Sequence, residues 1–109
     1  MSGYPSLSSI PPIPVKPKFQ GETRILSLDF TLELAPGETI STISGFVASV
    51  IQGEDATPQT IISGSASYIG NVVSQMITGG VSGTQYLISS TITTSFGETI
   101  EGKVSLWVV

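Results

Sequence analysis

The sequence of 109 residues contains neither cysteine nor histidine. Without cysteine, neither a disulfide framework nor a thiolate nucleophile can form. Without thiol and imidazole together, the usual general base of enzymes and most zinc sites are excluded. Asp29 and Glu33 share one face of a predicted strand, but about 13 Å at about 3.3 Å per residue is too far for a carboxylate dyad. The sequence therefore predicts a protein that is not an enzyme and that uses no metal ion or cofactor.

Charged residues are also scarce, at 11% of the chain, whereas Ser and Thr together number 29. Such hydroxyl-rich composition is typical of the exposed faces of β-sheets. Residues 1–24 carry three cations and one acid (+2), residues 25–109 carry one cation and seven acids (−6), and the two values sum to −4. An acidic body argues against nucleic-acid binding. A basic arm on that body would favour head-to-tail docking of copies, an effect that salt screens.

Long apolar runs are missing as well. No stretch of 18 apolar residues occurs, and the N-terminus has no charged segment followed by an apolar one. We therefore expect neither a transmembrane span nor a secretory signal peptide. The length corresponds to one domain with a modest core.

Proline is concentrated near the N-terminus, where residues 1–21 hold five of the seven prolines. Proline fixes its φ angle and lacks an N–H group, so this segment is predicted to be an extended, polyproline-II-like arm. Its apolar residues favour binding to a partner, because a stiff segment loses little entropy when it binds. A floppy tail and an arm folded back on its own domain are the alternatives. The predicted partner-binding residues are Ile10, Pro11, Pro12, Ile13, Pro14, Val15 and Phe19.

Strand periodicity begins at residue 22. Leu26, Leu28, Phe30 and Leu32 alternate with polar residues up to a turn at residues 35–38. Residues 39–51 form the next apolar segment, whose phase slips near Gly45. Such a slip predicts a bulge or bend, and a helix over residues 43–51 is the alternative.

A loop is predicted over residues 52–58, and two short strands follow at residues 60–68 and 70–78. Glu54 and Asp55 in that loop are two adjacent acids, whereas calcium needs six or more oxygen ligands. We therefore interpret them as a solvated loop tip in preference to a calcium site.

The C-terminal part reads as a β-hairpin. Tyr86, Ile88, Ile92 and Phe96 share one face of its first strand, which follows a Gly/Ser turn, and residues 99–109 form its second strand. Tyr86 occupies the position of a tyrosine corner, whose hydroxyl bonds an upstream backbone group; a core tyrosine with a hydrated hydroxyl is the alternative. Trp107 falls on the face opposite to the apolar residues and is a candidate interface residue.

Six or seven short strands without a convincing helix predict an all-β, immunoglobulin-like antiparallel β-sandwich, residues 22–109, preceded by an extended Pro-rich arm, residues 1–21. Two stretches carry a more specific pattern: LSLDFTLELAPGETI and GGVSGTQYLISSTITTSFGETIEGKVSLWV. They resemble a family of small immunoglobulin-like proteins from tailed-phage structural operons, the fiber-tail adaptor proteins. The resemblance covers roughly residues 22–109 and does not include the arm.

The resemblance implies a virion structural protein, without enzymatic activity, at the junction of fibres with the tail or baseplate. Its expected partners are tail, baseplate or fibre subunits and further copies in a symmetric ring, with neither nucleic acid nor membrane. Its expected location is the phage particle, and the host cytoplasm during assembly. Two alternatives stay open at this point: a capsid decoration protein, and a carbohydrate- or surface-binding module that uses exposed aromatic residues.

Overall fold

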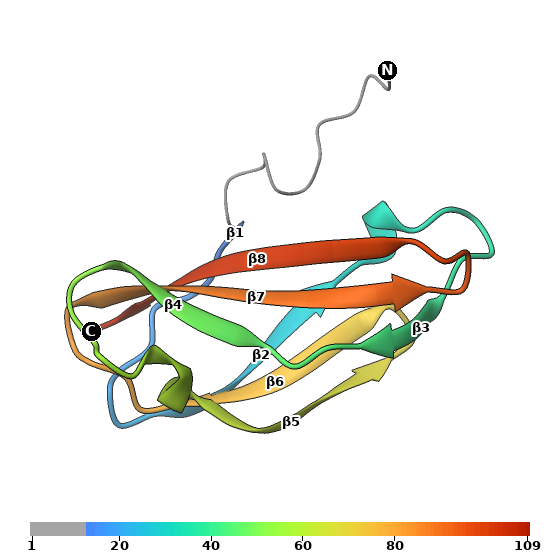
Figure 1. Ribbon diagram of the computed structural model, residues 1–109. Coiled ribbons are helices and arrows are strands. Elements are labelled where there is room, and N and C mark those ends of the chain that lie inside the picture. Colours follow the sequence, from blue (N-terminus) through green and yellow to red (C-terminus); the bar gives the residue numbers. More distant parts are fainter. Residues whose placement is uncertain (1–12) are drawn as a thin grey trace.

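The computed structural model describes residues 13–109 as two β-sheets packed face to face (Figure 1). The five-stranded sheet contains β1 (Ile13–Pro14), β3 (Ile40–Ile43), β4 (Val47–Gln52), β7 (Thr84–Thr94) and β8 (Thr99–Val108). The three-stranded sheet has the order β2 (Thr23–Asp29), β6 (Val72–Thr78), β5 (Ile62–Ile69). Two short 3-10 helices, η2 (Thr31–Glu33) and η3 (Pro58–Ile61), lie in the connections. The predicted all-β, two-sheet fold is confirmed.

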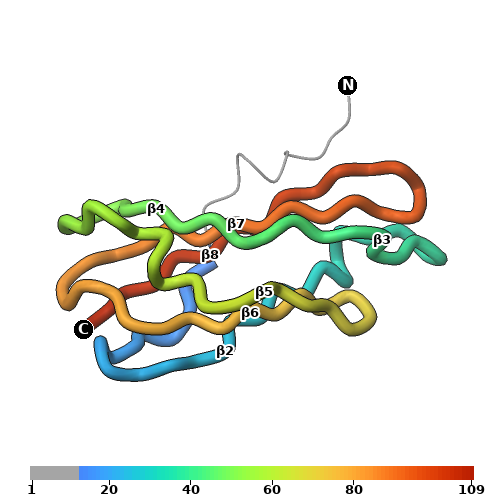
Figure 2. The backbone as a smooth tube through the Cα atoms, turned by 60° about the horizontal axis from the view of Figure 1, so that its bottom comes forward, coloured from blue at the N-terminus to red at the C-terminus, as the bar shows by residue number. Residues whose placement is uncertain are grey.

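Strand β7 is the centre of the larger sheet. It pairs with β8 over ten consecutive register positions, and on its other side with β3 and β4. Its buried and half-buried residues alternate strictly along its whole length, as expected for a strand with one face in the core. Figure 2 shows this sheet lying over the smaller one. The buried apolar side chains between them are Leu26, Leu28, Phe30, Ile40, Phe46, Ala48, Ile61, Val73, Ile77, Tyr86, Ile88, Ile92, Val104, Leu106 and Val108.

The phase slip near Gly45 is a break between two strands of one sheet. Strand β3 pairs with the C-terminal half of β7 and β4 with its N-terminal half. The side chain of Gln59 holds the backbone where β4 begins. Its Oε1 accepts from the Ala48 N–H (2.9 Å), and its Nε2 donates to the Phe46 carbonyl (2.8 Å). The alternative of a helix over residues 43–51 is wrong, because the pairing available along β7 satisfies this backbone as strand.

Two residues assigned to strand faces by periodicity lie outside the strands. Leu32 was predicted to continue the buried face of β2, yet it lies in η2 and is 96% exposed. Asp29 ends the strand, because its Oδ1 accepts from the Thr31 N–H (2.9 Å) and the Thr31 hydroxyl, a local Asx turn. Phe96 likewise follows the end of β7 and is exposed in the β7–β8 turn.

The backbone of β8 comes close to side chains of the other layer at Gly102. A Cβ atom at this position would lie 3.0 Å from Cζ of Phe30 and 3.4 Å from Cδ1 of Leu28. The aromatic ring that follows β2 therefore occupies part of the space that a side chain on β8 would fill, so a larger residue at this position would require the ring to shift.

Candidate functional site

The described part of the Pro-rich arm lies along the edge of its own larger sheet. β1 runs parallel to β8, with Ile13 opposite Val104. Three backbone hydrogen bonds extend the contact: Val15 N–H to Ser105 O (3.1 Å), Lys18 N–H to Trp107 O (3.0 Å) and Val109 N–H to Lys18 O (2.8 Å). Proline is tolerated because an edge strand needs hydrogen bonds on one side only. For residues 13–18, the geometry is that of an arm folded back on its own domain.

This pairing brings two separately predicted groups of residues to one edge. Strand β8, which receives the arm, also carries Trp107. Ile13 is 61% exposed, Phe19 is 65% exposed and Trp107 is 38% exposed, which is substantial for large apolar side chains. Pro14 is also exposed, and Val15 is half-buried. Ile10, Pro11 and Pro12 lie outside the described residues. We call Ile13, Pro14, Phe19 and Trp107 the arm edge.

Lys18 does not belong to a basic surface, contrary to the expectation of a charged arm. Its side chain is 1% exposed, and its ammonium donates to the carbonyls of Gly79 (2.6 Å), Phe19 (2.8 Å) and Gln20 (3.4 Å). Burial lowers the pKa of this ammonium, and the nearby Glu22 carboxylate opposes that effect. Three carbonyl acceptors allow the cation to be buried, so Lys18 fixes the arm to the β6–β7 turn.

Tyr86 forms the upstream backbone bond expected for a tyrosine corner. The side chain is fully buried, and its hydroxyl accepts from the Val81 N–H (2.8 Å). The hydroxyl also donates to Oδ2 of Asp55 (2.7 Å), in the loop between β4 and η3. Burial and the Asp55 carboxylate raise the pKa of Tyr86. Gly80 lies next to the ring, where its φ of +96° suits glycine and a Cβ atom would lie 2.9 Å from Cγ2 of Val108.

Asp55 is part of this corner and not simply a solvated loop tip. Its Oδ1 accepts from the Thr57 N–H (2.9 Å), and the hydrogen bonds from Tyr86 and Thr57 lower its pKa. Within residues 13–109 no three acidic side chains converge in a way that would hold a metal ion. The Asp-x-Thr spacing signals the Thr57 turn in the sequence. No local pattern signals the contact with Tyr86, 31 residues away.

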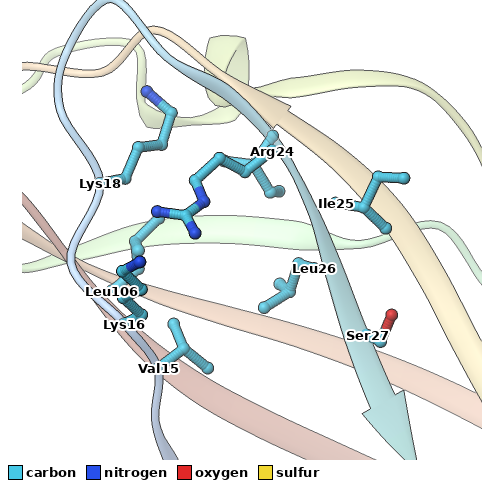
Figure 3. A pocket seen from close by; sticks show the side chains of 9 residues that line it. Val15, Lys16, Lys18, Arg24, Ile25, Leu26, Ser27 and Leu106 are labelled. Atoms are coloured by element: carbon cyan, nitrogen blue, oxygen red, sulfur yellow. The ribbon is translucent and has the colours of Figure 1, made fainter.

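A pocket opens between the arm and the free edge of β2 (Figure 3). Its volume is about 180 Å³, and apolar side chains from both sheets form much of its wall: Val15, Ile25, Leu26, Ile77 and Leu106. Lys16 and Arg24 contribute cationic groups, and Nη1 of Arg24 reaches the Pro17 carbonyl (3.4 Å) and Glu22 (3.7 Å). An apolar pocket with exposed cations suits an apolar group that carries a neighbouring carboxylate.

The opposite end of the sandwich is acidic. Its turns carry Asp29, Glu33, Glu38 and Glu98, and no described cation. Glu38 is buried: its carboxylate accepts from the Thr94 hydroxyl and from the Ala35 N–H (2.8 Å), and these bonds lower its pKa. The same carboxylate raises the pKa of Glu98 through a hydrogen bond and charge repulsion. This pairing of turns across the sheet was not predicted.

Comparison with known families gives a match over most of the chain. The model of the family described as podophage GP4 fiber-tail adaptor protein gp77 matches residues 18–107. The match begins at Lys18, where the arm joins the sandwich, and spans both sheets. Searches among curated proteins and among solved structures found no match.

Proposed function

Because the chain belongs to the podophage GP4 fiber-tail adaptor protein family, we propose that its arm edge is the surface through which it joins fibres to the tail. Family membership identifies the chain as a virion structural adaptor of a podophage and not an enzyme. Among the three functions considered from the sequence, it selects the adaptor over a capsid decoration protein and a glycan-binding module.

The match over residues 18–107 carries this proposal, and the geometry of the arm supports its molecular detail. The arm edge gathers exposed apolar and aromatic side chains where the chain runs on to residues 1–12. Residues Ile10, Pro11 and Pro12 extend the same pattern in the sequence. A stiff apolar segment that continues from a fixed edge strand is suited to bind a groove on a neighbouring virion subunit.

We further propose an immunoglobulin-like topology for residues 22–109, with residues 1–21 acting as the arm. Support comes from the two packed sheets and from the Tyr86 hydroxyl, which bonds the Val81 backbone. The partners are tail, baseplate or fibre subunits and further copies of the chain in a symmetric ring, without nucleic acid or membrane. Assembly takes place in the host cytoplasm, and the final location is the tail of the particle.

The experiment removes residues 1–12 and leaves β1 and Lys18 in place. A deletion that reached Lys18 would also expose the edge of β8, so its effect on assembly would be ambiguous. We expect the shortened protein to keep the melting temperature of the wild type but to be missing from purified particles, as measured by mass spectrometry and immunogold electron microscopy. Ile69→Ser is the control, because Ile69 is 86% exposed on the other sheet.

If the shortened protein enters particles at normal occupancy, residues 1–12 have no role in attachment. If the wild-type protein is labelled on the head and not on the tail, the proposed location is wrong.

A further inference from the structure

The net charge of the chain is confined to one end of the sandwich. The turn end, which we define as residues 29–39, 70–71 and 95–98, carries four acids (Asp29, Glu33, Glu38 and Glu98) and no cation. Every charged residue lies within the described part, and the other four acids and four cations cancel, so the turn end accounts for the whole charge of −4. The pocket is lined by three of the four cations: Lys18, whose ammonium is bonded to backbone carbonyls, and Lys16 and Arg24.

The turn end also displays apolar side chains beside its acids. Leu32 is 96% exposed in η2, directly before the exposed Glu33. Phe96, 59% exposed, stands in the β7–β8 turn two residues before Glu98. The 3-10 turn places Leu32 outside the sandwich because Asp29 has already ended β2. Because Leu32 is almost fully exposed, its side chain is available to insert into a pocket on another molecule.

The pocket has the complementary features. Its volume of about 180 Å³ exceeds the roughly 150 Å³ of an apolar cavity that accepts a six-carbon ring, so the four-carbon side chain of leucine fits. Apolar side chains form about half of its surface, and Lys16 and Arg24 lie beside them (Figure 3), so a carboxylate next to an inserted apolar group would meet a cation. The neighbouring backbone edge of β2 is unpaired among residues 13–109, so nothing described there blocks an approaching turn.

We propose that copies of this chain associate head to tail, with Leu32 of one copy inserted into the pocket of the next and Glu33 paired with Lys16 and Arg24. The two surfaces are different and lie on different parts of the molecule, so the contact is heterologous and generates a ring when its rotation closes. The inference rests on the adaptor function proposed above, in which several copies surround the tail, and it assigns the contact between them.

The test measures self-association of the full-length protein by sedimentation velocity from about 10 μM to about 1 mM in low salt. We expect the wild type to form oligomers as its concentration rises, and added salt to weaken them because ion pairs at the surface are screened. Leu32→Asp and Lys16→Glu each remove one side of the contact. Burial of a leucine side chain corresponds to a ten- to hundredfold change in affinity, so Leu32→Asp should associate at least about tenfold more weakly. Lys16→Glu should also weaken association, because it places a carboxylate opposite Glu33.

Mixing the two variants distinguishes this contact from any symmetric one. The Lys16→Glu protein keeps its Leu32, and the Leu32→Asp protein keeps its pocket, so one intact contact remains between unlike chains. We expect a 1:1 heterodimer and no larger species. In a symmetric contact, every mixed pair would contain both substitutions, so mixing the variants would not restore association.

Val47→Asp and Lys103→Glu are the matched controls. Both introduce the same chemical changes on the outer face of the larger sheet, where Val47 is exposed and Lys103 pairs with Glu101 at 3.6 Å. Each control should associate like the wild type. The inference is overturned if the wild type is monomeric at about 1 mM, if the mixture remains monomeric, or if the controls weaken association equally. If the head-to-tail contact is refuted while the protein lacking residues 1–12 is still excluded from particles, the adaptor proposal is unaffected.

Discussion

The corner around Tyr86 makes a sharp prediction about stability, because one hydroxyl connects three segments of the chain. Replacing Tyr86 by phenylalanine keeps the buried ring but removes the oxygen that accepts from Val81 and donates to Asp55. The Val81 N–H and the Asp55 carboxylate then each lose a partly buried hydrogen bond next to the fully buried Tyr86 ring. Loss of these bonds, one of them to a charged group, costs about 1–3 kcal/mol.

This value is a large part of the total stability of a domain of this size, about 5–15 kcal/mol. It corresponds to a decrease in melting temperature of about 4–24 °C, since 1 kcal/mol shifts the midpoint by roughly 4–8 °C in small domains. Thermal and urea unfolding, followed by circular dichroism, measure both quantities. The slope of the urea dependence should not change, because the substitution leaves the surface buried on folding unaltered.

Tyr68→Phe is the matched control. The Tyr68 hydroxyl donates to the Ser41 carbonyl at 3.3 Å on a side chain that is 40% exposed, so water replaces the lost partner. Its effect should stay within about 0.5 kcal/mol. A double-mutant cycle adds Asp55→Ala, and the effect of Tyr86→Phe should be smaller in that background because the two groups share one hydrogen bond. Equal effects of the two Tyr→Phe substitutions, or strict additivity with Asp55→Ala, would refute the assigned network.

Two further predictions concern packing and acid stability. Gly102→Ala places a Cβ atom 3.0 Å from the Phe30 ring and should lower the free energy of unfolding, measured in urea, by about 1–3 kcal/mol. The control Gly45→Ala, with nothing within 4 Å of its Cβ and an ordinary φ, should be neutral or slightly stabilising. A neutral Gly102→Ala would contradict the close approach of the sheets. The pKa values of Asp55 and Glu38 are lowered in the folded state, so their stabilisation is complete above the unfolded values of 3.8 and 4.5 and is lost as the pH falls through the lower folded values. The melting temperature should therefore decrease below about pH 4.5, and less steeply for Asp55→Asn than for the wild type; identical profiles would show that Asp55 is not hydrogen-bonded as described.

How far the sequence could predict the molecule differs between strands and turns. Period-two alternation identified β2, β7 and β8 because one face of each strand packs on the core and the other is more exposed. The same rule misplaced Leu32 and Phe96, since alternation continues through a turn while the backbone does not. Local signals existed in both places, such as the Asx turn formed by Asp29 and Thr31, and they override the strand pattern.

The sequence by itself determined the class of fold, the family and the absence of enzymatic chemistry, because these depend on residue types, on periodicity and on short motifs. Only the tertiary structure decided what the individual polar groups do. It buried Lys18 against three carbonyls, joined Asp55 to Tyr86, and placed Glu38 beside Thr94, which is 56 residues away. It also set the arm beside Trp107 and opened a cation-rimmed pocket at a sheet edge. The physical reason is that such contacts join strands distant in the chain, and pairing between strands is fixed by the whole packed sandwich and not by any local segment.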